Sequence, residues 1–143
     1  MNDAWMFLSI GHAGGDRRWV GLPEVIATAD GLNHLIPLAE EMQEAISTLI
    51  GAGLVEAKGV ETRLTASGAA AFAEATRSDA GYIQQMLDLD AAWRARGYPG
   101  AVATPWPLDE ATWRHAADAY HRDMEAKHPE LRMMRGIDDD ADS

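Results

Sequence analysis

The feature that most constrains the fold of this chain is a stretch in residues 37–68 that combines a helix, a glycine stop and a hairpin. The first half of the stretch carries apolar residues at the i, i+3, i+4 and i+7 spacing of one buried helix face. These residues are Met42, Ala45, Ile46, Leu49 and Ile50. Pro37 suits the first turn of a helix, and Gly51 and Gly53 supply the left-handed backbone with which helices often end. We therefore predict a helix from residue 38 to about residue 52.

A β-hairpin is predicted directly after this helix. Residues 54–57 and 61–64 alternate as short strands around Lys58-Gly59-Val60, which is a turn signal. The hydroxyl of Thr65 can then cap the next helix. The order of helix, hairpin and helix predicts a small β-wing between helical elements.

The rest of the chain is predicted to be helical and irregular. Short helices are expected at residues 4–10 and 23–29, with loops at residues 11–16 and 30–34. The fold class that we predict is therefore mainly α with a small β-wing.

A longer helical pattern follows the wing. It covers residues 65–96, where Gly81 kinks or divides it, and a last helix begins after Asp109, which is a good N-cap. We expect residues 1–68 to form the domain that carries the wing and residues 69–130 to form a helical extension. Residues 131–143 are expected to be an acidic, disordered tail.

Charge and cysteine content exclude several classes of protein. Twelve basic and 23 acidic residues give a net charge of −11, and the acidic excess is not confined to the tail. The chain has no cysteine, so disulfides and thiolate metal sites are ruled out. The N-terminal sequence lacks the basic residues of a signal peptide, and no apolar run reaches the roughly 20 residues needed to cross a membrane. We expect a cytoplasmic protein that does not contact membranes.

Three pieces of the sequence resemble winged helix-turn-helix domains, in particular bacterial transcription regulators of the MarR and PadR types. They are Leu49-Ile50-Gly51-Ala52-Gly53-Leu54-Val55-Glu56, Lys58-Gly59, and Leu64-Thr65-Ala66-Ser67-Gly68. The resemblance covers about residues 4–75. It implies a winged helix-turn-helix followed by a C-terminal helical hairpin, with the helix at residues 38–52 as the recognition helix in the DNA major groove.

The predicted recognition helix is acidic. A helical projection places Glu40, Gln43, Glu44 and Ser47 opposite the apolar stripe, where they would face a partner. Residues 37–57 contain no Lys or Arg, so the carboxylates on this face would repel the phosphate backbone. We call these four residues the expected interaction face, and their charge disfavours nucleic acid.

Two functions remain open at this point. In the first, the chain is a non-enzymatic winged-helix protein that acts through contact with a protein partner or through self-association. In the second, it is a divergent transcription regulator that binds DNA with Arg17, Arg18, Lys58 and Arg63. The basic pair beside Trp19 can also be read as a solvated loop whose Trp fills the core.

Aromatic residues mark a candidate dimer surface. Trp93, Tyr98 and Trp106 flank an irregular Pro/Gly connection, and Trp113 lies on the last helix. Rigid aromatic side chains often line interfaces. The resemblance implies dimerisation through helices outside the wing domain, so a homodimer is expected to use these residues.

We expect no catalytic site, cofactor or metal. The serines lack a nucleophile elbow or a neighbouring His with an orienting acid, and the glycine-rich residues 11–15 lack the Lys-Ser/Thr of a phosphate-binding loop. Asp118, His121 and Glu125 share a helix face that could bind a divalent ion, but such combinations are common on charged helices.

Overall fold

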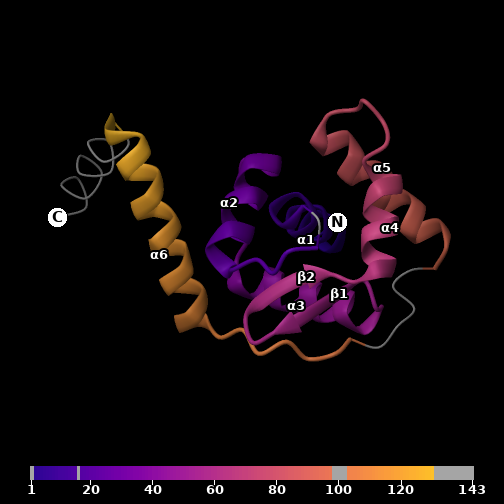
Figure 1. Ribbon diagram of the computed structural model, residues 1–143, viewed down its shortest axis with the longest axis horizontal. Coiled ribbons are helices and arrows are strands. Elements are labelled where there is room, and N and C mark those ends of the chain that lie inside the picture. Colours follow the sequence, from indigo (N-terminus) through magenta and orange to yellow (C-terminus); the bar gives the residue numbers. More distant parts are fainter. Residues whose placement is uncertain (1, 16, 98–102, 131–143) are drawn as a thin grey trace.

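The structure is a computed structural model that describes residues 2–15, 17–97 and 103–130. It is mainly helical with one small two-stranded antiparallel sheet, which confirms the predicted fold class (Figure 1). The elements in chain order are α1 (Asn2–Gly14), α2 (Leu22–Asn33), α3 (Ala39–Gly51), β1 (Val55–Lys58), β2 (Glu61–Leu64), α4 (Ala66–Ala75), α5 (Tyr82–Ala95) and α6 (Glu110–Lys127).

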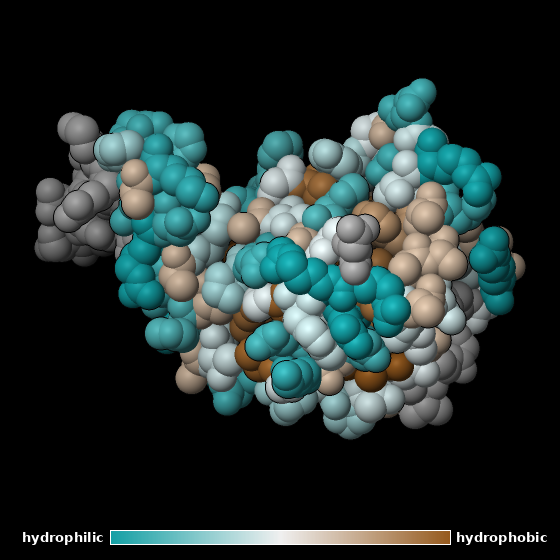
Figure 2. Space-filling view, in the orientation of Figure 1, coloured by the Kyte–Doolittle hydropathy of each residue, from teal (hydrophilic) through white to brown (hydrophobic). Residues whose placement is uncertain are grey.

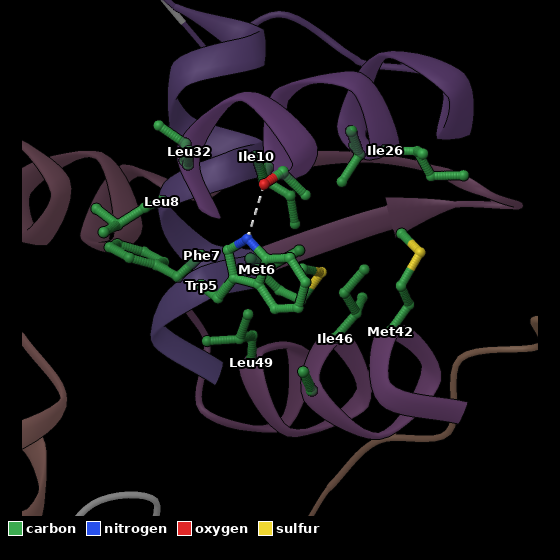
Figure 3. Packing of buried hydrophobic residues seen from close by; sticks show 14 of the residues in the cluster. Trp5, Met6, Phe7, Leu8, Ile10, Ile26, Leu32, Met42, Ile46 and Leu49 are labelled. Atoms are coloured by element: carbon green, nitrogen blue, oxygen red, sulfur yellow. Dashed lines mark hydrogen bonds between the residues drawn. The ribbon is translucent and has the colours of Figure 1, made fainter. Parts of the chain in front are cut away.

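Helix α1 is the centre of the fold. Every residue from position 4 to position 10 is buried, including Ser9, whose hydroxyl donates a hydrogen bond to the Trp5 carbonyl at 2.7 Å. A helix that is apolar on all sides must be covered on all sides. Accordingly α2, α3, α4, α5 and β2 all pack against it. The Trp5 indole lies between helices and donates to the Ala29 carbonyl of α2 at 3.0 Å (Figure 3).

Helix α3 forms where the sequence predicts it. Met42, Ala45, Ile46 and Leu49 are buried, as the apolar spacing predicts, and Ile50 is partly buried. Met42, Ile46 and Leu49 point toward α1 and α2 (Figure 3). Burial of this one stripe leaves the opposite side of α3 available to other contacts.

The wing joins the helical core through a third short segment. β1 and β2 pair from Val55 opposite Leu64 to Lys58 opposite Glu61, and the turn between them uses Gly59 at a φ of 62°. Val20, just before α2, forms a bridge with Thr62, with backbone hydrogen bonds of 2.9 and 3.0 Å. The bridge ties the wing to the segment between α1 and α2.

Two predicted loops are largely helical. α1 continues through Gly11 to Gly14, and α2 continues to Asn33, after which His34 ends it in the left-handed conformation. A Cβ on Gly11 would lie 2.3 Å from the Phe72 ring, so this glycine permits close packing and does not break the helix. α2 is extended because Leu32 joins the core.

The C-terminal helices cover different sides of the core. Gly81 divides the long helical pattern and stands at the N-cap of α5. α5 packs against α1, α2 and α4, whereas α6 packs against α2 and α3, on the opposite side of the molecule (Figure 1). This differs from the expected helical hairpin, because each helix finds apolar partners on the N-terminal helices. The expected tail, residues 131–143, lies outside the described residues.

The start of α4 requires a glycine. Gly68 lies so close to the wing that a Cβ there would be 2.0 Å from the backbone carbonyl oxygen of Leu54. The same turn is capped as predicted, since the Thr65 hydroxyl accepts from the Gly68 N–H at 3.0 Å and donates to the Gly53 carbonyl at 2.6 Å. The last residue of the Leu-Thr-x-x-Gly pattern therefore has a steric role.

Gly68→Ala should destabilise the protein by about 2–3 kcal/mol, because a backbone carbonyl cannot yield to the added methyl group. Urea unfolding followed by circular dichroism measures this. Gly31→Ala is the control, because a Cβ at Gly31, inside α2, meets nothing within 4 Å. It should stabilise by about 0.5–1 kcal/mol. Equal effects of the two changes would contradict the close approach at Gly68.

A partly buried hydrogen bond joins helix α6 to α2. Tyr120 faces inward with Ala116 and Ala117, and its hydroxyl donates to Asp30 Oδ2 at 2.5 Å. Burial, with the hydrogen bond to Asp30 as a second cause, raises the pKa of Tyr120 to about 12. The visible face of α6 is largely hydrophilic (Figure 2), so its attachment depends on these few inward residues.

The raised pKa predicts a loss of stability at high pH. The hydroxyl proton is retained in the folded protein up to a pH of about 12 but is lost from the unfolded chain at a pH of about 10. The free energy of unfolding should therefore fall as the pH rises from about 10 to about 12. Urea unfolding at a series of pH values measures this. In Tyr120→Phe this part of the pH dependence should be absent, and an unchanged slope would contradict the assignment.

Candidate functional site: the outer face of α3 and the wing

The expected interaction face of α3 is only partly exposed. Glu40 and Glu44 are exposed, Gln43 is partly buried and Ser47 is only 4% exposed. The prediction that all four residues lie free at the surface is therefore wrong for Ser47. The cause is another part of the chain that lies over this face of the helix.

The covering segment is residues 103–108, which we call the strap. Trp106 at its centre is 1% exposed, although it lies in an irregular connection. Its backbone N–H donates to the Ser47 hydroxyl at 3.1 Å, and its carbonyl accepts from Gln43 Nε2 at 3.3 Å. The backbone N–H of Thr104 donates to the Ser47 carbonyl at 3.0 Å. The polar groups of Gln43 and Ser47 are thus occupied by the strap.

The strap also reaches the wing. The indole N–H of Trp106 donates to the carbonyl of Gly59, in the turn between β1 and β2, at 3.0 Å. Trp106 therefore connects α3, through its backbone, with the tip of the wing, through its indole. These are the two elements with which a winged helix would contact DNA.

The strap leads directly into α6, whose first turn is well anchored. The Asp109 carboxylate accepts from the backbone N–H of Thr112 at 2.7 Å, which confirms the predicted N-cap. This hydrogen bond lowers the pKa of Asp109. Trp113 donates its indole N–H to the Pro37 carbonyl, just before α3, at 2.9 Å. The strap is therefore held on α3 at Gln43 and Ser47, and the start of α6 is held at Pro37.

Two of the four expected DNA-binding residues meet on the wing. Arg63 pairs with Glu56 across the ladder, and Arg17 Nη2 lies 3.7 Å from the same carboxylate oxygen. The Arg63 guanidinium also lies over the Trp19 ring at 4.3 Å from its centre. Arg17 Nε donates to the Leu64 carbonyl at 3.1 Å. The cluster is held together by contacts within the chain, and Glu56 lies between its two positive charges.

The other two basic residues each have an acidic neighbour of their own. Arg18 pairs with Glu24 of α2 at 2.8 Å and donates to the Ala13 carbonyl at 2.9 Å. The hydrogen bond from Arg18 lowers the pKa of Glu24. Lys58 lies opposite Glu61 in the wing ladder. The four bases therefore do not form one surface of unbalanced positive charge.

The expected dimer residues mostly make contacts inside the chain. Trp93 is buried, with its ring 5.3 Å from that of Phe7, because it closes the core between α5 and α1. Trp106, at the centre of the strap, is buried against α3 and the wing turn, and Trp113 is partly buried at Pro37. Tyr98 lies outside the described residues. The expectation that these tryptophans are available to a second copy is therefore wrong for Trp93 and Trp106.

A different apolar surface is exposed on α5. Tyr82, Ile83 and Leu87 are 54%, 46% and 39% exposed, although their helical spacing suggests a buried stripe. The buried side of α5 instead carries Met86 and Leu89, with Trp93. Sequence spacing could not decide between the two sides because apolar residues occur on both.

Other candidate chemistry in the described residues is limited. A groove of about 330 Å³ lies between α4 and α5. Desolvation lowers the pKa of His12. No group of three His, Asp or Glu side chains is arranged to hold a metal ion in residues 2–15, 17–97 and 103–130. Among the helices of this same part of the chain, none has the length and apolar character needed to cross a bilayer.

Comparison of the chain with protein-family models, with curated proteins and with solved structures gave no match. What the chain does must therefore be inferred from its own geometry.

The strap is the feature that sequence reasoning missed. The sequence Thr104-Pro105-Trp106-Pro107 indicates a rigid connection, but it does not indicate which surface the tryptophan will contact. A possible signal was Ser47, a small polar residue that lies beside the apolar stripe of α3 and can accept a hydrogen bond from an extended segment.

Ser47→Ala should lower the free energy of unfolding by about 1–3 kcal/mol, because the buried N–H of Trp106 loses its acceptor. Urea unfolding followed by tryptophan fluorescence measures this. Ser67→Ala, on the exposed side of α4, is the control and should change stability by less than about 0.5 kcal/mol. A neutral Ser47→Ala would contradict the docking of the strap.

Proposed function

We propose that this chain is a non-enzymatic winged-helix protein that acts through protein–protein contact and does not read DNA with α3. The observation that carries this proposal is the strap. A recognition helix contacts base edges with its outer side chains, and here Gln43 and Ser47 are hydrogen-bonded to the strap.

The order of the elements supports the winged-helix part of the proposal. α1 is followed by the bridging segment at Val20, then by α2, α3 and the two strands of the wing. The wing turn and the outer face of α3 lie on one side of the core, joined by Trp106. This order and pairing of the elements support the proposed winged-helix fold.

Charge argues against nucleic acid as the partner. The side chains of α3 that stay exposed beside the strap include Glu40 and Glu44, and the whole chain carries −11. Affinity for DNA comes largely from neutralising phosphates with Lys and Arg, and the exposed carboxylates of Glu40 and Glu44 oppose this. A protein partner with basic residues suits the same surface better.

The alternative is a transcription regulator that binds DNA through the wing with Arg17 and Arg18. One observation favours it. Arg17 and Arg63 share the outer face of the wing and outnumber the single carboxylate of Glu56 between them. A weak phosphate contact at this cluster would not need α3.

Fluorescence anisotropy with mixed-sequence duplex DNA, at low and then moderate salt, tests the proposal. We expect no binding at micromolar concentrations of the wild-type protein. Glu40→Lys together with Glu44→Lys should raise nonspecific affinity, because both residues are exposed and the change moves the local charge by +4. Micromolar, salt-sensitive binding by the wild type that is lost in Arg17→Ala with Arg18→Ala would favour the alternative.

A matched pair of changes separates local from overall charge. Asp118→Lys together with Asp123→Lys makes the same change in net charge on the exposed side of α6. If this control raises DNA affinity as much as the α3 pair, the acidic face of α3 is not what excludes DNA. Self-association is measured in the same samples by light scattering, and a stable dimer would fit the proposed function.

A further inference from the structure

We propose that the surface at Gln43, Ser47 and Gly59 that holds Trp106, which we call the groove, is a docking site for an extended segment of a partner protein. This partner segment carries a tryptophan between prolines and has basic flanks. The strap is the intramolecular occupant of this groove. The inference rests on the proposed function, since it names the surface and the chemistry of the protein contact.

The strap contacts the groove in the manner of a short recognition motif. One side chain, that of Trp106, is buried to 1% exposure, whereas Thr104, Pro105 and Pro107 beside it are exposed. A single deeply buried aromatic residue with exposed neighbours is the usual anchor of a small interface. The groove thus buries one side chain, and the neighbouring side chains stay exposed to solvent.

The backbone of the strap is bound at alternate residues. The N–H groups of Thr104 and Trp106 donate to the carbonyl and the hydroxyl of Ser47, at 3.0 and 3.1 Å. An extended chain presents every second N–H to the same side. One residue of α3 therefore binds two positions of an extended segment through groups that every non-proline residue has.

The prolines stand at the positions where an N–H is not needed. Pro105 and Pro107 have no backbone donor, and they alternate with the two residues whose N–H groups are bound. Proline also holds the segment near an extended conformation before it binds, which lowers the entropy lost on docking. The residues of the strap that have a backbone N–H are thus the ones that lie beside the two acceptors of Ser47.

The groove distinguishes tryptophan from other large apolar residues. The indole N–H donates to the Gly59 carbonyl of the wing turn at 3.0 Å. Phenylalanine or leucine would leave this acceptor without its partner, and tyrosine would place its hydroxyl elsewhere. The preferred anchor of a partner is therefore tryptophan.

Charge separates a partner from the strap itself. Glu40 and Glu44 are exposed on the helix that forms the groove, whereas the strap has no Lys or Arg and is followed by Asp109 and Glu110. A segment with Lys or Arg beside the tryptophan complements the groove better than the strap does. It must still displace a tethered competitor whose effective concentration is on the order of millimolar. The groove is therefore closed until such a partner arrives.

The test uses the chain of residues 1–143 with Trp106→Ala, which removes the anchor of the strap and keeps Gln43, Ser47 and Gly59. The probe is a fluorescein-labelled synthetic peptide with the sequence of residues 103–108 and two lysines at each end, and binding is measured by anisotropy. We expect the variant to bind this peptide at least tenfold more tightly than the wild-type chain does. A peptide with Ala in place of Trp should not bind, and a peptide with Glu flanks should bind more weakly.

Two further variants keep the result interpretable. Trp106→Phe still fills the groove but loses the hydrogen bond to Gly59. Its affinity for the peptide should therefore lie between that of the wild type and that of Trp106→Ala. It carries the test if Trp106→Ala does not fold. Trp19→Ala removes a tryptophan outside the groove and should bind the peptide no better than the wild type.

Several outcomes overturn the inference. Equal peptide affinity in wild type, Trp106→Phe and Trp106→Ala would mean that the strap does not occupy a peptide site. A wild-type dimer that disappears in Trp106→Ala, without any peptide binding, would assign the groove to a second copy of this chain. DNA binding by the wild-type protein would overturn the proposed function and leave a positive peptide result standing. Failure of the peptide alone would overturn only this inference.

Discussion

The burial of α1 is the constraint on which the rest of the structure depends. Seven consecutive residues, 4–10, are buried, so each side of this helix needs an apolar partner. α2 and α3 supply two of them, and α4, α5 and β2 supply the others. Burial of apolar surface contributes about 25 cal/mol per Å², so leaving any side of α1 in water would be costly. α3 therefore turns its apolar stripe inward and its polar side outward.

The orientation of α3 determines where the strap binds. Its outer side, with Gln43 and Ser47, offers a donor, a hydroxyl and a carbonyl at adjacent positions, and the strap satisfies all three. Because Trp106 also binds the Gly59 carbonyl, the position of the wing turn relative to α3 depends on the strap. The surface that the winged-helix resemblance assigns to DNA is used for an internal contact. The proposed partner segment would use the same groups in the same way.

Local signals in the sequence predicted those parts of the fold that local physics decides. The apolar spacing of α3, the caps at Thr65 and Asp109 and the hairpin at Gly59 each depend on interactions within a few residues, and the structure confirms them. The candidate site was predicted less well. Glu40 and Glu44 lie at the surface as expected, but Ser47 and Trp106 are buried against one another, 59 residues apart in sequence. Contacts between such distant residues leave no periodic pattern.

The sequence by itself determined a mainly helical chain with a small wing, an acidic α3 and the absence of cysteine chemistry, because composition and short-range spacing specify these properties. Only the tertiary structure decided that Gly11 lies inside a helix and that α5 exposes Tyr82, Ile83 and Leu87. It also decided that α5 and α6 pack on opposite sides of the core and that the strap covers α3. The physical reason is the same in each case. An apolar residue or an unpaired backbone group is stabilised by whichever partner the packed chain brings to it, and the local sequence does not contain that partner.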